Sequence, residues 1–481
     1  MDEYLPTIGL EIHAELKTKT KMFCDSKNDA NETRPNVNIC PVCLAHPGTL
    51  PVINGEAVKH VLKVGIALRS DLADYTEFDR KNYFYPDLPK GYQLSQYEYP
   101  LVSGGELAGV AITRIHLEED TASSIHDEET GATSIDYNRA GVPLMELVTE
   151  PVIHSAEDAG KFARELQLLL RTLGVSEANM EKGEMRVEAN VSVGKGDVLG
   201  TKVEIKNLNS FNAMERAVRY EIVRQKKVLE KGGTIEQQTL GWDEAKQATF
   251  AQRSKEGSAD YRYFPDPDLP SLQLSEIAEF KRESLQKEMP ELPSERRERF
   301  QALGIKADDA DAFVRQVSLG ALFEEAVRFF GEGDKGVQLA ANYIANDIVN
   351  IIRDTDNRDT ENNAEIPISA QNFNKIIILV RDSKISSRAA KDMLAVYAKG
   401  EQSDPDAYVA AHGLLQEGAS DKLAGAVSSV IAKNPSAAAD FRAGKGAALE
   451  FLLGQCMREL RGAADPNVLR TLIQEEIMRL P

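Results

Sequence analysis

The sequence predicts an α+β protein in which a sheet-rich N-terminal region is followed by helices. Segments that alternate apolar and polar residues, such as residues 7–16, concentrate before about residue 291, and a period of two is typical of half-buried strands. Beyond that point the strand signals fade, and amphipathic helical segments follow one another between glycine, proline and polar loops. A second domain boundary is expected at residues 400–405. The sequence therefore predicts three domains: 1–291, 292–404 and 405–481.

Length and charge narrow the class of protein further. A chain of 481 residues is long enough for about three domains. Its longest apolar runs fall far short of the ~20 residues of a membrane span, and its acidic start matches neither a signal nor a transit peptide. We therefore expect a cytoplasmic protein without a membrane partner. The net charge of −19 argues against indiscriminate nucleic-acid binding, although residues 381–481 carry thirteen basic and thirteen acidic residues.

The first expected strand, residues 7–16, separates an apolar face from a polar one. Its polar face contains Glu11, His13 and Glu15, because side chains two positions apart point to the same side. A solvated face of an antiparallel sheet explains this pattern. A Glu-x-His pair on one strand face can also chelate a cation.

Three of the four cysteines lie close together near the N-terminus. Cys24 is followed by the pair Cys40 and Cys43 in a Cys-x-x-Cys motif, which is a zinc-binding pattern. His46 is the nearest candidate for a fourth ligand, since Cys456 lies a whole domain away. The alternative is a set of reduced cysteines left from a lost site.

An amphipathic helix is expected at residues 55–70, and an aromatic and proline-rich segment follows at residues 79–92. Such a segment is usually a packed loop. In a functional interpretation it forms a pocket wall, with Arg80 and Lys81 directed at phosphate.

The central stretch, residues 111–151, contains two acidic residues in apolar surroundings. Counting by twos places Glu119 on the face of Ile115 and Leu117, and Glu146 lies between Met145 and Leu147. An isolated buried carboxylate is strongly disfavoured, so each must be protonated, paired or bound to a metal. The pattern leaves two explanations open: an ion pair with Arg114 or Arg139, or a metal site.

The remaining elements are defined by caps and glycines. Ser155 and Asp158 predict the start of a helix that ends at Gly174, strands are expected at residues 185–193 and 201–208, and Asn212 and Glu215 predict the next helix start. A second aromatic run covers residues 260–270. In the tail, the glycine loop 441–446 precedes a helix at residues 447–460. It is no Walker A motif, and turn glycines explain it best.

Six runs of sequence resemble one family along essentially the whole chain. The family is that of the B subunits of the tRNA-dependent aspartyl/glutamyl-tRNA amidotransferases, the GatB component of GatCAB. The runs are GLEIHAELKTKTKMF, FDRKNYFYPDLPKGYQLSQYEYPL, RIHLEEDTASS, DYNRAGVPLMELV, KVEIKNLNSFN and EGSADYRYFPDPDLP.

The resemblance implies a first domain with the glutamine-synthetase-like cradle fold, followed by an all-α helical domain and a small all-α tail that binds tRNA. It also implies a ligase activity: ATP activates the side-chain carboxylate of misacylated Glu-tRNA(Gln) or Asp-tRNA(Asn), and ammonia then forms the amide. The ammonia would come from glutamine through the amidase, GatA, in a heterotrimer that also contains the small GatC protein.

The resemblance further implies roles for individual residues. The family's magnesium ligands correspond here to Glu11, His13, Glu119 and Glu146, which favours the metal explanation for the two buried carboxylates. By analogy, Lys81, Arg114 and Glu119 would be catalytic and Arg80 and Lys81 would bind nucleotide. Arg442 and Lys445 of the tail would contact tRNA.

One departure from the family pattern concerns zinc. Zinc-bearing members have Cys-x-Cys where this chain has Cys24 followed by Ser26, so a zinc site of Cys24, Cys40, Cys43 and His46 is expected only if another group completes it. Two other functions remain as alternatives. One is a non-catalytic tRNA-binding scaffold with structural ion pairs, and the other is a free-standing glutamine-synthetase-like ligase for a small substrate.

Overall fold

The computed structural model of the protein describes residues 4–29, 32–127, 129–196, 198–253, 261–355, 366, 368–401, 403–416, 420–460 and 464–479. The chain divides into two compact units, residues 1–293 and 294–481, each of which is described by itself. Asp260 and most of the polar loop 354–365 lie outside the described residues.

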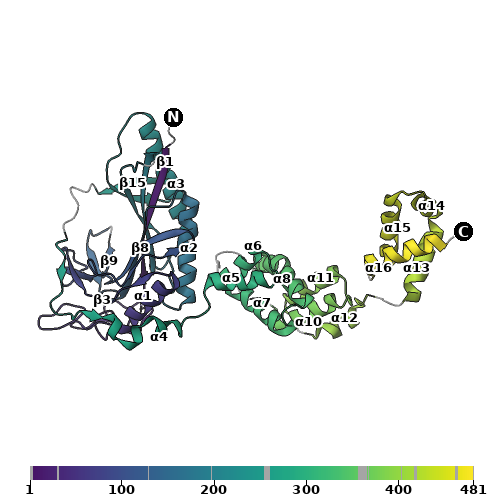
Figure 1. The fold of residues 1–481 in the computed structure, drawn as a ribbon, viewed down its shortest axis with the longest axis horizontal. Helices are drawn as coiled ribbons and strands as arrows, with labels where there is room; N and C mark the ends of the chain where they lie inside the picture. The colour runs from purple at the N-terminus through teal and green to yellow at the C-terminus, as the bar shows by residue number, and fades with distance from the viewer. Residues whose placement is uncertain are drawn as a thin grey trace. The chain divides into compact units, whose positions relative to one another are not determined.

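A large sheet forms the centre of the first unit (Figure 1). Among the described residues it has ten strands, in the order β15-β14-β13-β12-β1-β11-β8-β6-β2, with β7 paired to β8. Every pairing is antiparallel except that of β13 with β14. The strands are β1 (Tyr4–Glu15), β2 (Asp71–Leu72), β6 (Val102–Ser103), β7 (Glu106–Leu107), β8 (Val110–Glu119), β11 (Pro143–Thr149), β12 (Met185–Lys195), β13 (Val203–Leu208), β14 (Thr239–Asp243) and β15 (Ala248–Arg253).

Three helices cover one face of this sheet: α1 (Gly55–Ala67), α2 (Ala156–Thr172) and α3 (Phe211–Glu230). Their apolar sides pack against the inward residues of β1, β8, β11 and β12 in one core. Ser155 caps α2, as the sequence predicts. The predicted cap of α3 is wrong, because Ser210 rather than Asn212 accepts the hydrogen bond from the backbone of Ala213.

Smaller elements surround the opposite face. A three-stranded sheet consists of β16 (Phe264–Pro265), β4 (Asp79–Asn82) and β5 (Tyr92–Ser95), and β5 packs near β8. The two aromatic runs of the sequence are therefore neighbours in space, since Phe264 pairs with Arg80. The remaining elements of this unit are β3 (Tyr75–Thr76), β9 (Ser123–His126), β10 (Thr133–Asp136), β17 (Leu272–Gln273), two short 3₁₀ turns (Leu274–Glu276 and Ala278–Phe280) and α4 (Arg282–Gln286).

From Pro293 onward the described elements are helices. They are α5 (Pro293–Ala302), α6 (Ala307–Arg315), α7 (Val317–Phe330), α8 (Lys335–Tyr343), a π-helical segment (Ile344–Ile348), α9 (Val349–Thr355), α10 (Ala370–Arg381), α11 (Ser387–Tyr397), α12 (Pro405–His412), α13 (Ser420–Lys433), α14 (Pro435–Arg442), α15 (Gly446–Glu459) and α16 (Pro466–Arg479). Helices α13 to α16 share a core of their own. The α+β class is confirmed. No helix among the described residues is both long and apolar enough to cross a membrane.

Candidate active site

The face of the sheet opposite α1, α2 and α3 gathers polar side chains from three adjacent strands. In the register of β1, β11 and β8, His13 lies opposite Glu146, and Glu146 lies opposite His116. Strand alternation adds Glu11 beside His13 and Glu118 beside His116 on the same side. We call these five residues, Glu11, His13, His116, Glu118 and Glu146, the carboxylate–histidine cluster.

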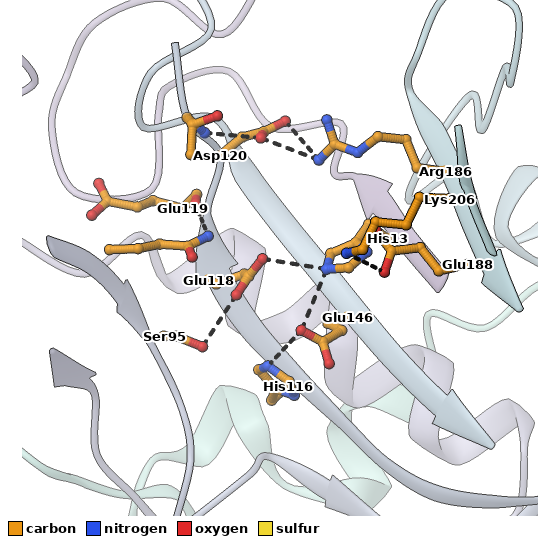
Figure 2. Close-up of polar contacts among 12 residues, drawn as sticks. His13, Ser95, His116, Glu118, Glu119, Asp120, Glu146, Arg186, Glu188 and Lys206 are labelled. Atoms are coloured by element: carbon orange, nitrogen blue, oxygen red, sulfur yellow. Dashed lines mark hydrogen bonds and ion pairs between the residues drawn. The ribbon is translucent and has the colours of Figure 1, made fainter. Parts of the chain in front are cut away.

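Four side chains of the cluster, His13, His116, Glu118 and Glu146, contact one another directly (Figure 2). His13 Nε2 lies 3.3 Å from Glu146 Oε2 and 3.6 Å from Glu118 Oε1. His116 Nε2 lies 3.3 Å from the same Glu146 oxygen, and Ser95 Oγ donates a hydrogen bond of 3.2 Å to Glu118 Oε2. His116, Glu118 and Glu146 are buried, so their charges interact with little screening by water.

Their ligand atoms form two overlapping groups, each with separations within 4.8 Å. One group is Glu11, His13 and Glu146, and the other is His116, Glu118 and Glu146. Carboxylate oxygens with an imidazole nitrogen suit Mg²⁺ or Mn²⁺, and the two carboxylates of each group repel one another unless positive charge lies beside them. The chemistry of the donors therefore fits a divalent cation.

Electrostatics within the cluster support this conclusion. Burial alone lowers the pKa of His13, but its hydrogen bond to Glu146 and the charge of Glu118 outweigh burial and raise that pKa to about 9. Burial alone raises the pKa of Glu146, but His116 and His13 hold it well below its usual range. Without a metal ion, the cluster thus depends on positive charge at His13.

Glu119 does not join the cluster, contrary to the sequence-based ligand set. Its carboxylate accepts a hydrogen bond from the backbone amide of Leu94 (2.9 Å) and forms an ion pair with Lys90 (2.5 Å). Figure 2 shows Glu119 directed away from His13 and Glu146. Adjacent residues of a strand point to opposite faces, so Glu118 takes the position expected for Glu119.

A register shift between Val148 and Thr149 interrupts the alternation of β8 only before Arg114, so that Ile112 and Ile115 both belong to the core. From Arg114 to Glu119 the register is regular. Glu119 therefore lies on the side of Ile115 and Leu117, as counting by twos predicts, and His116 and Glu118 lie on the side of the cluster. His116 and Glu118 were missed, although their position two residues apart, alternating with Leu117, is the same signal that marked Glu11 and His13.

Arg80 and Lys81, the two predicted phosphate-binding cations on β4, point to different sides of the strand. Burial alone lowers the pKa of Lys81, but the charge of Glu118, then Tyr263 and Glu146, raises it above its ordinary value, so Lys81 belongs to the electrostatic environment of the cluster. Arg80, its neighbour, points to the other side. Its guanidinium pairs with Asp266 (2.6 Å) and Asp268 (3.1 Å) and stacks on a tyrosine ring. The structure thus does not bring Arg80 to the predicted nucleotide site.

Arg114 and Arg139, the two candidate ion-pair partners, take different positions. Arg114 lies 3.6 Å from Glu146 Oε1 and is partly exposed, so it borders the cluster. Arg139 instead pairs with Asp120 at 2.8 Å. Arg186 also donates to Asp120, and Glu15 lies 3.5 Å from Arg139. We call these four residues, Glu15, Asp120, Arg139 and Arg186, the arginine–carboxylate network.

The three N-terminal cysteines form a separate cluster in the same unit. The sulfurs of Cys24, Cys40 and Cys43 lie within 4.8 Å of one another. His46 borders the same cavity as Cys24 and Cys43, but its ring is not part of the group of three sulfurs. A hydrogen bond from Cys24, with help from the Cys40 amide, lowers the pKa of Cys43.

The predicted tRNA contacts of the tail differ in availability. Arg442 donates hydrogen bonds to the carbonyl of Ile477 near the end of α16, the shorter at 2.8 Å, so it stabilises the tail itself. Lys445 is exposed and forms a surface pair with Asp440 at 2.9 Å. A surface pair of this kind opens at little cost, which leaves Lys445 available to a phosphate.

Comparisons with known proteins give a consistent result. Residues 6–278 match the GatB/GatE catalytic domain, and residues 321–477 match the GatB domain. The aspartyl/glutamyl-tRNA(Asn/Gln) amidotransferase B subunit of Thermus thermophilus is 43% identical over 479 residues, covering 98% of this chain and 99% of the relative. The B subunits of Carboxydothermus hydrogenoformans and Thermomicrobium roseum are 40% and 42% identical, with at least 99% of each chain covered. The chain belongs to the family of aspartyl/glutamyl-tRNA(Asn/Gln) amidotransferase B subunits.

Proposed function

We propose that this chain uses ATP to activate the side-chain carboxylate of misacylated Glu-tRNA(Gln) or Asp-tRNA(Asn) and converts it to an amide. The carboxylate attacks the γ-phosphorus and ADP leaves. Ammonia then attacks the acyl phosphate, inorganic phosphate leaves, and the amide forms. The observation that carries this proposal is the carboxylate–histidine cluster with Lys81 at its edge, on the face of the large, mostly antiparallel sheet that lies opposite α1, α2 and α3.

Within this proposal the chain holds Mg²⁺ through Glu11, His13, Glu118 and Glu146, with His116 as a further donor. Bound there, the ion would neutralise phosphate oxygens and orient them for in-line transfer. Glu118 replaces Glu119 in the proposed ligand set, because the carboxylate of Glu118 is the one that lies beside His13.

Lys81 and Arg114 would hold the charge that develops on the transferred phosphoryl group. Both are cations next to the cluster carboxylates, and preorganised positive charge in a site shielded from water is worth far more than in water. Arg80 is left out of this role because Asp266 and Asp268 already engage its guanidinium.

The remaining parts of the proposal concern partners. We assign the first unit the glutamine-synthetase-like cradle fold, and we assign the supply of ammonia to the amidase GatA, in a heterotrimer with the small GatC protein.

We assign tRNA binding to the tail, residues 405–481. There, Lys445→Ala should weaken tRNA binding and reduce its salt dependence by at most about one unit of slope, with uncharged tRNA as the probe.

The test is ATP hydrolysis by the assembled complex with and without misacylated tRNA. We expect hydrolysis to require the misacylated tRNA, and Glu146→Gln to reduce it by ~10²–10³, about 3–4 kcal/mol of barrier. Glu150→Gln is a suitable control, because Glu150 directly follows the same strand and its carboxylate accepts a hydrogen bond from Thr113, outside the cluster. Full activity of folded Glu146→Gln would favour the scaffold function.

A further inference from the structure

Five tyrosines from two distant parts of the sequence form one group of contacting rings beside the carboxylate–histidine cluster. Tyr97 and Tyr263 are stacked, with ring centroids 4.4 Å apart and planes 12° apart. Tyr261 makes edge-to-face contacts with Tyr263 at 6.0 Å and with Tyr83 at 5.8 Å. Tyr83 in turn contacts Tyr85 at 6.3 Å. We call these five residues, Tyr83, Tyr85, Tyr97, Tyr261 and Tyr263, the tyrosine platform.

Hydrogen bonds hold the two segments of the platform together. The backbone amide of Asn82 donates to the carbonyl of Tyr261 (2.9 Å). The side chain of Asn82 donates to the carbonyls of Tyr261 (3.2 Å) and Arg262 (2.8 Å), and Phe264 pairs with Arg80 in the three-stranded sheet. The rings are therefore positioned before a ligand arrives, which lowers the entropic cost of binding.

The inner end of the platform adjoins the carboxylate–histidine cluster. Lys81 Nζ lies 5.2 Å from the centre of the Tyr261 ring. The same ammonium interacts electrostatically with Glu118, Tyr263 and Glu146. Burial raises the pKa of Tyr263 to about 12, against the charge of Lys81. Tyr263 therefore remains a neutral ring next to the carboxylates of the cluster.

The outer end of the platform faces solvent. Tyr97 and Tyr85 are 61% and 56% exposed, whereas aromatic residues that only pack loops together are mostly buried. Exposed apolar side chains that gather in one place mark a binding surface. Exposed aromatic rings are the surfaces on which unpaired nucleic-acid bases stack. The platform thus extends from solvent to the cluster and offers ring faces along this path.

We infer that the tyrosine platform binds the unpaired 3′ end of the tRNA, with the adenine of the terminal nucleotide stacked on the rings next to the cluster. This inference rests on the proposed function, in which the amino acid esterified to that nucleotide must reach the carboxylate–histidine cluster. Five rings offer more surface than one base requires, and successive unpaired bases stack on successive aromatic side chains. Stacking tolerates different bases and reads no tRNA identity, which suits an end that Glu-tRNA(Gln) and Asp-tRNA(Asn) share.

Steady-state kinetics of tRNA-dependent ATP hydrolysis by the assembled complex test this inference. Because Tyr97 is exposed, Tyr97→Ala should fold. We expect its kcat/KM for misacylated tRNA to fall by about 5- to 100-fold, the usual contribution of one stacked base. Tyr97→Phe keeps the ring and should restore most of this loss. ATP carries the same adenine ring, so its KM is measured as well and should change by less than about twofold.

Tyr99→Ala is the matched control. Tyr99 is two residues from Tyr97 and is also exposed, at 43%. Its ring packs edge-to-face on Tyr75 at 5.1 Å, outside the platform. Removal of the Tyr99 ring should therefore leave kcat/KM for misacylated tRNA within about twofold of the wild type.

Direct binding separates this inference from the proposed function. An RNA acceptor-stem minihelix with its unpaired 3′ end should bind the assembled complex about 5- to 100-fold more tightly than the same minihelix without that end, measured by fluorescence anisotropy. The difference should shrink in Tyr97→Ala and persist in Tyr99→Ala. A complex that shows this pattern but hydrolyses no ATP would contradict the proposed function and support the platform.

Three results would overturn the inference. The first is wild-type kcat/KM for misacylated tRNA in the folded double variant Tyr85→Ala/Tyr97→Ala. The second is a raised KM for ATP with unchanged constants for tRNA, which would assign the rings to the adenine of ATP. The third is an equal loss in Tyr97→Ala and Tyr99→Ala, which would mean that the platform has no special role.

Discussion

Two groups of buried charged residues lie next to each other on the same sheet and differ in the balance of negative and positive charge. The arginine–carboxylate network contains two carboxylates and two guanidinium groups, and Asp120 accepts hydrogen bonds from both arginines. The carboxylate–histidine cluster contains three carboxylates, and its neighbouring cations are Lys81, the partly exposed Arg114 and Lys206, which is itself paired with Glu188. The first group is complete by itself, whereas the second requires further positive charge.

This difference separates a structural role from a functional one. Burial raises the pKa of Glu15, with the charge of Asp120 adding to the effect, to about 8, so Glu15 can take up a proton and leave Asp120 as the carboxylate that both arginines share. In the cluster, the raised pKa of His13 means that a proton provides the positive charge. Buried charge therefore does not by itself indicate a site, but unbalanced buried charge does.

The largest expected effect on stability is in the network. Asp120→Asn leaves Arg139 and Arg186 without their shared carboxylate, and removal of one partner from a buried pair costs about 3–5 kcal/mol. We expect a free energy of unfolding lower by about 3 kcal/mol and a Tm lower by roughly 5–10 °C. Thermal and denaturant unfolding measure both quantities.

A surface pair provides the control for that measurement. Glu157 and Arg219 form an ion pair in which both side chains are more than half exposed, so Glu157→Gln should change stability by less than about 0.5 kcal/mol. Equal effects of the two substitutions would mean that the network has no special structural role.

The next effect is on activity, in the cluster. Lys81→Met removes a cation that interacts with Glu118 and Glu146, and we expect tRNA-dependent ATP hydrolysis to fall by ~10². Binding of tRNA should change much less, because the tail is unaffected. Wild-type hydrolysis by Lys81→Met would assign Lys81 to local packing alone.

The smallest effect is expected for Arg80, which directly precedes Lys81 on β4. Arg80→Met breaks the pairs with Asp266 and Asp268, and because Asp266 is buried the loss of stability should be about 1–2 kcal/mol. Hydrolysis per folded molecule should remain within about fivefold of the wild type. A loss as large as that of Lys81→Met would show that both neighbours act in the site.

Alternation in the sequence predicted much of the sheet and part of the site. It placed Glu11 and His13 on one face, and β1 shows clear alternation of buried and half-buried residues. The family's ligand pattern pointed to Glu119 rather than Glu118, and burial does not distinguish the two, because the last five residues of β8 are all buried. The contacts between side chains of β8, β11 and β1 depend on the register of these strands. A shift of one residue would turn the side chains of a strand to the other face of the sheet.

The position of Arg80 was unpredictable for a related reason. It depends on Asp266 and Asp268, which are distant from it in sequence. The helix start at Ser155 and the class of the fold depend on local signals, and those predictions are confirmed.

The most direct test of the account compares Glu118→Gln with Glu119→Gln in tRNA-dependent ATP hydrolysis by the assembled complex. Both changes remove one buried charge from adjacent residues, but only Glu118 lies in the cluster. We predict a loss of ~10²–10³ for Glu118→Gln, with an unchanged or higher Tm and partial recovery at high Mg²⁺ or Mn²⁺. For Glu119→Gln we predict a loss of less than about tenfold. The reverse order, or a Glu118→Gln protein that is destabilised but fully active per folded molecule, would contradict the account.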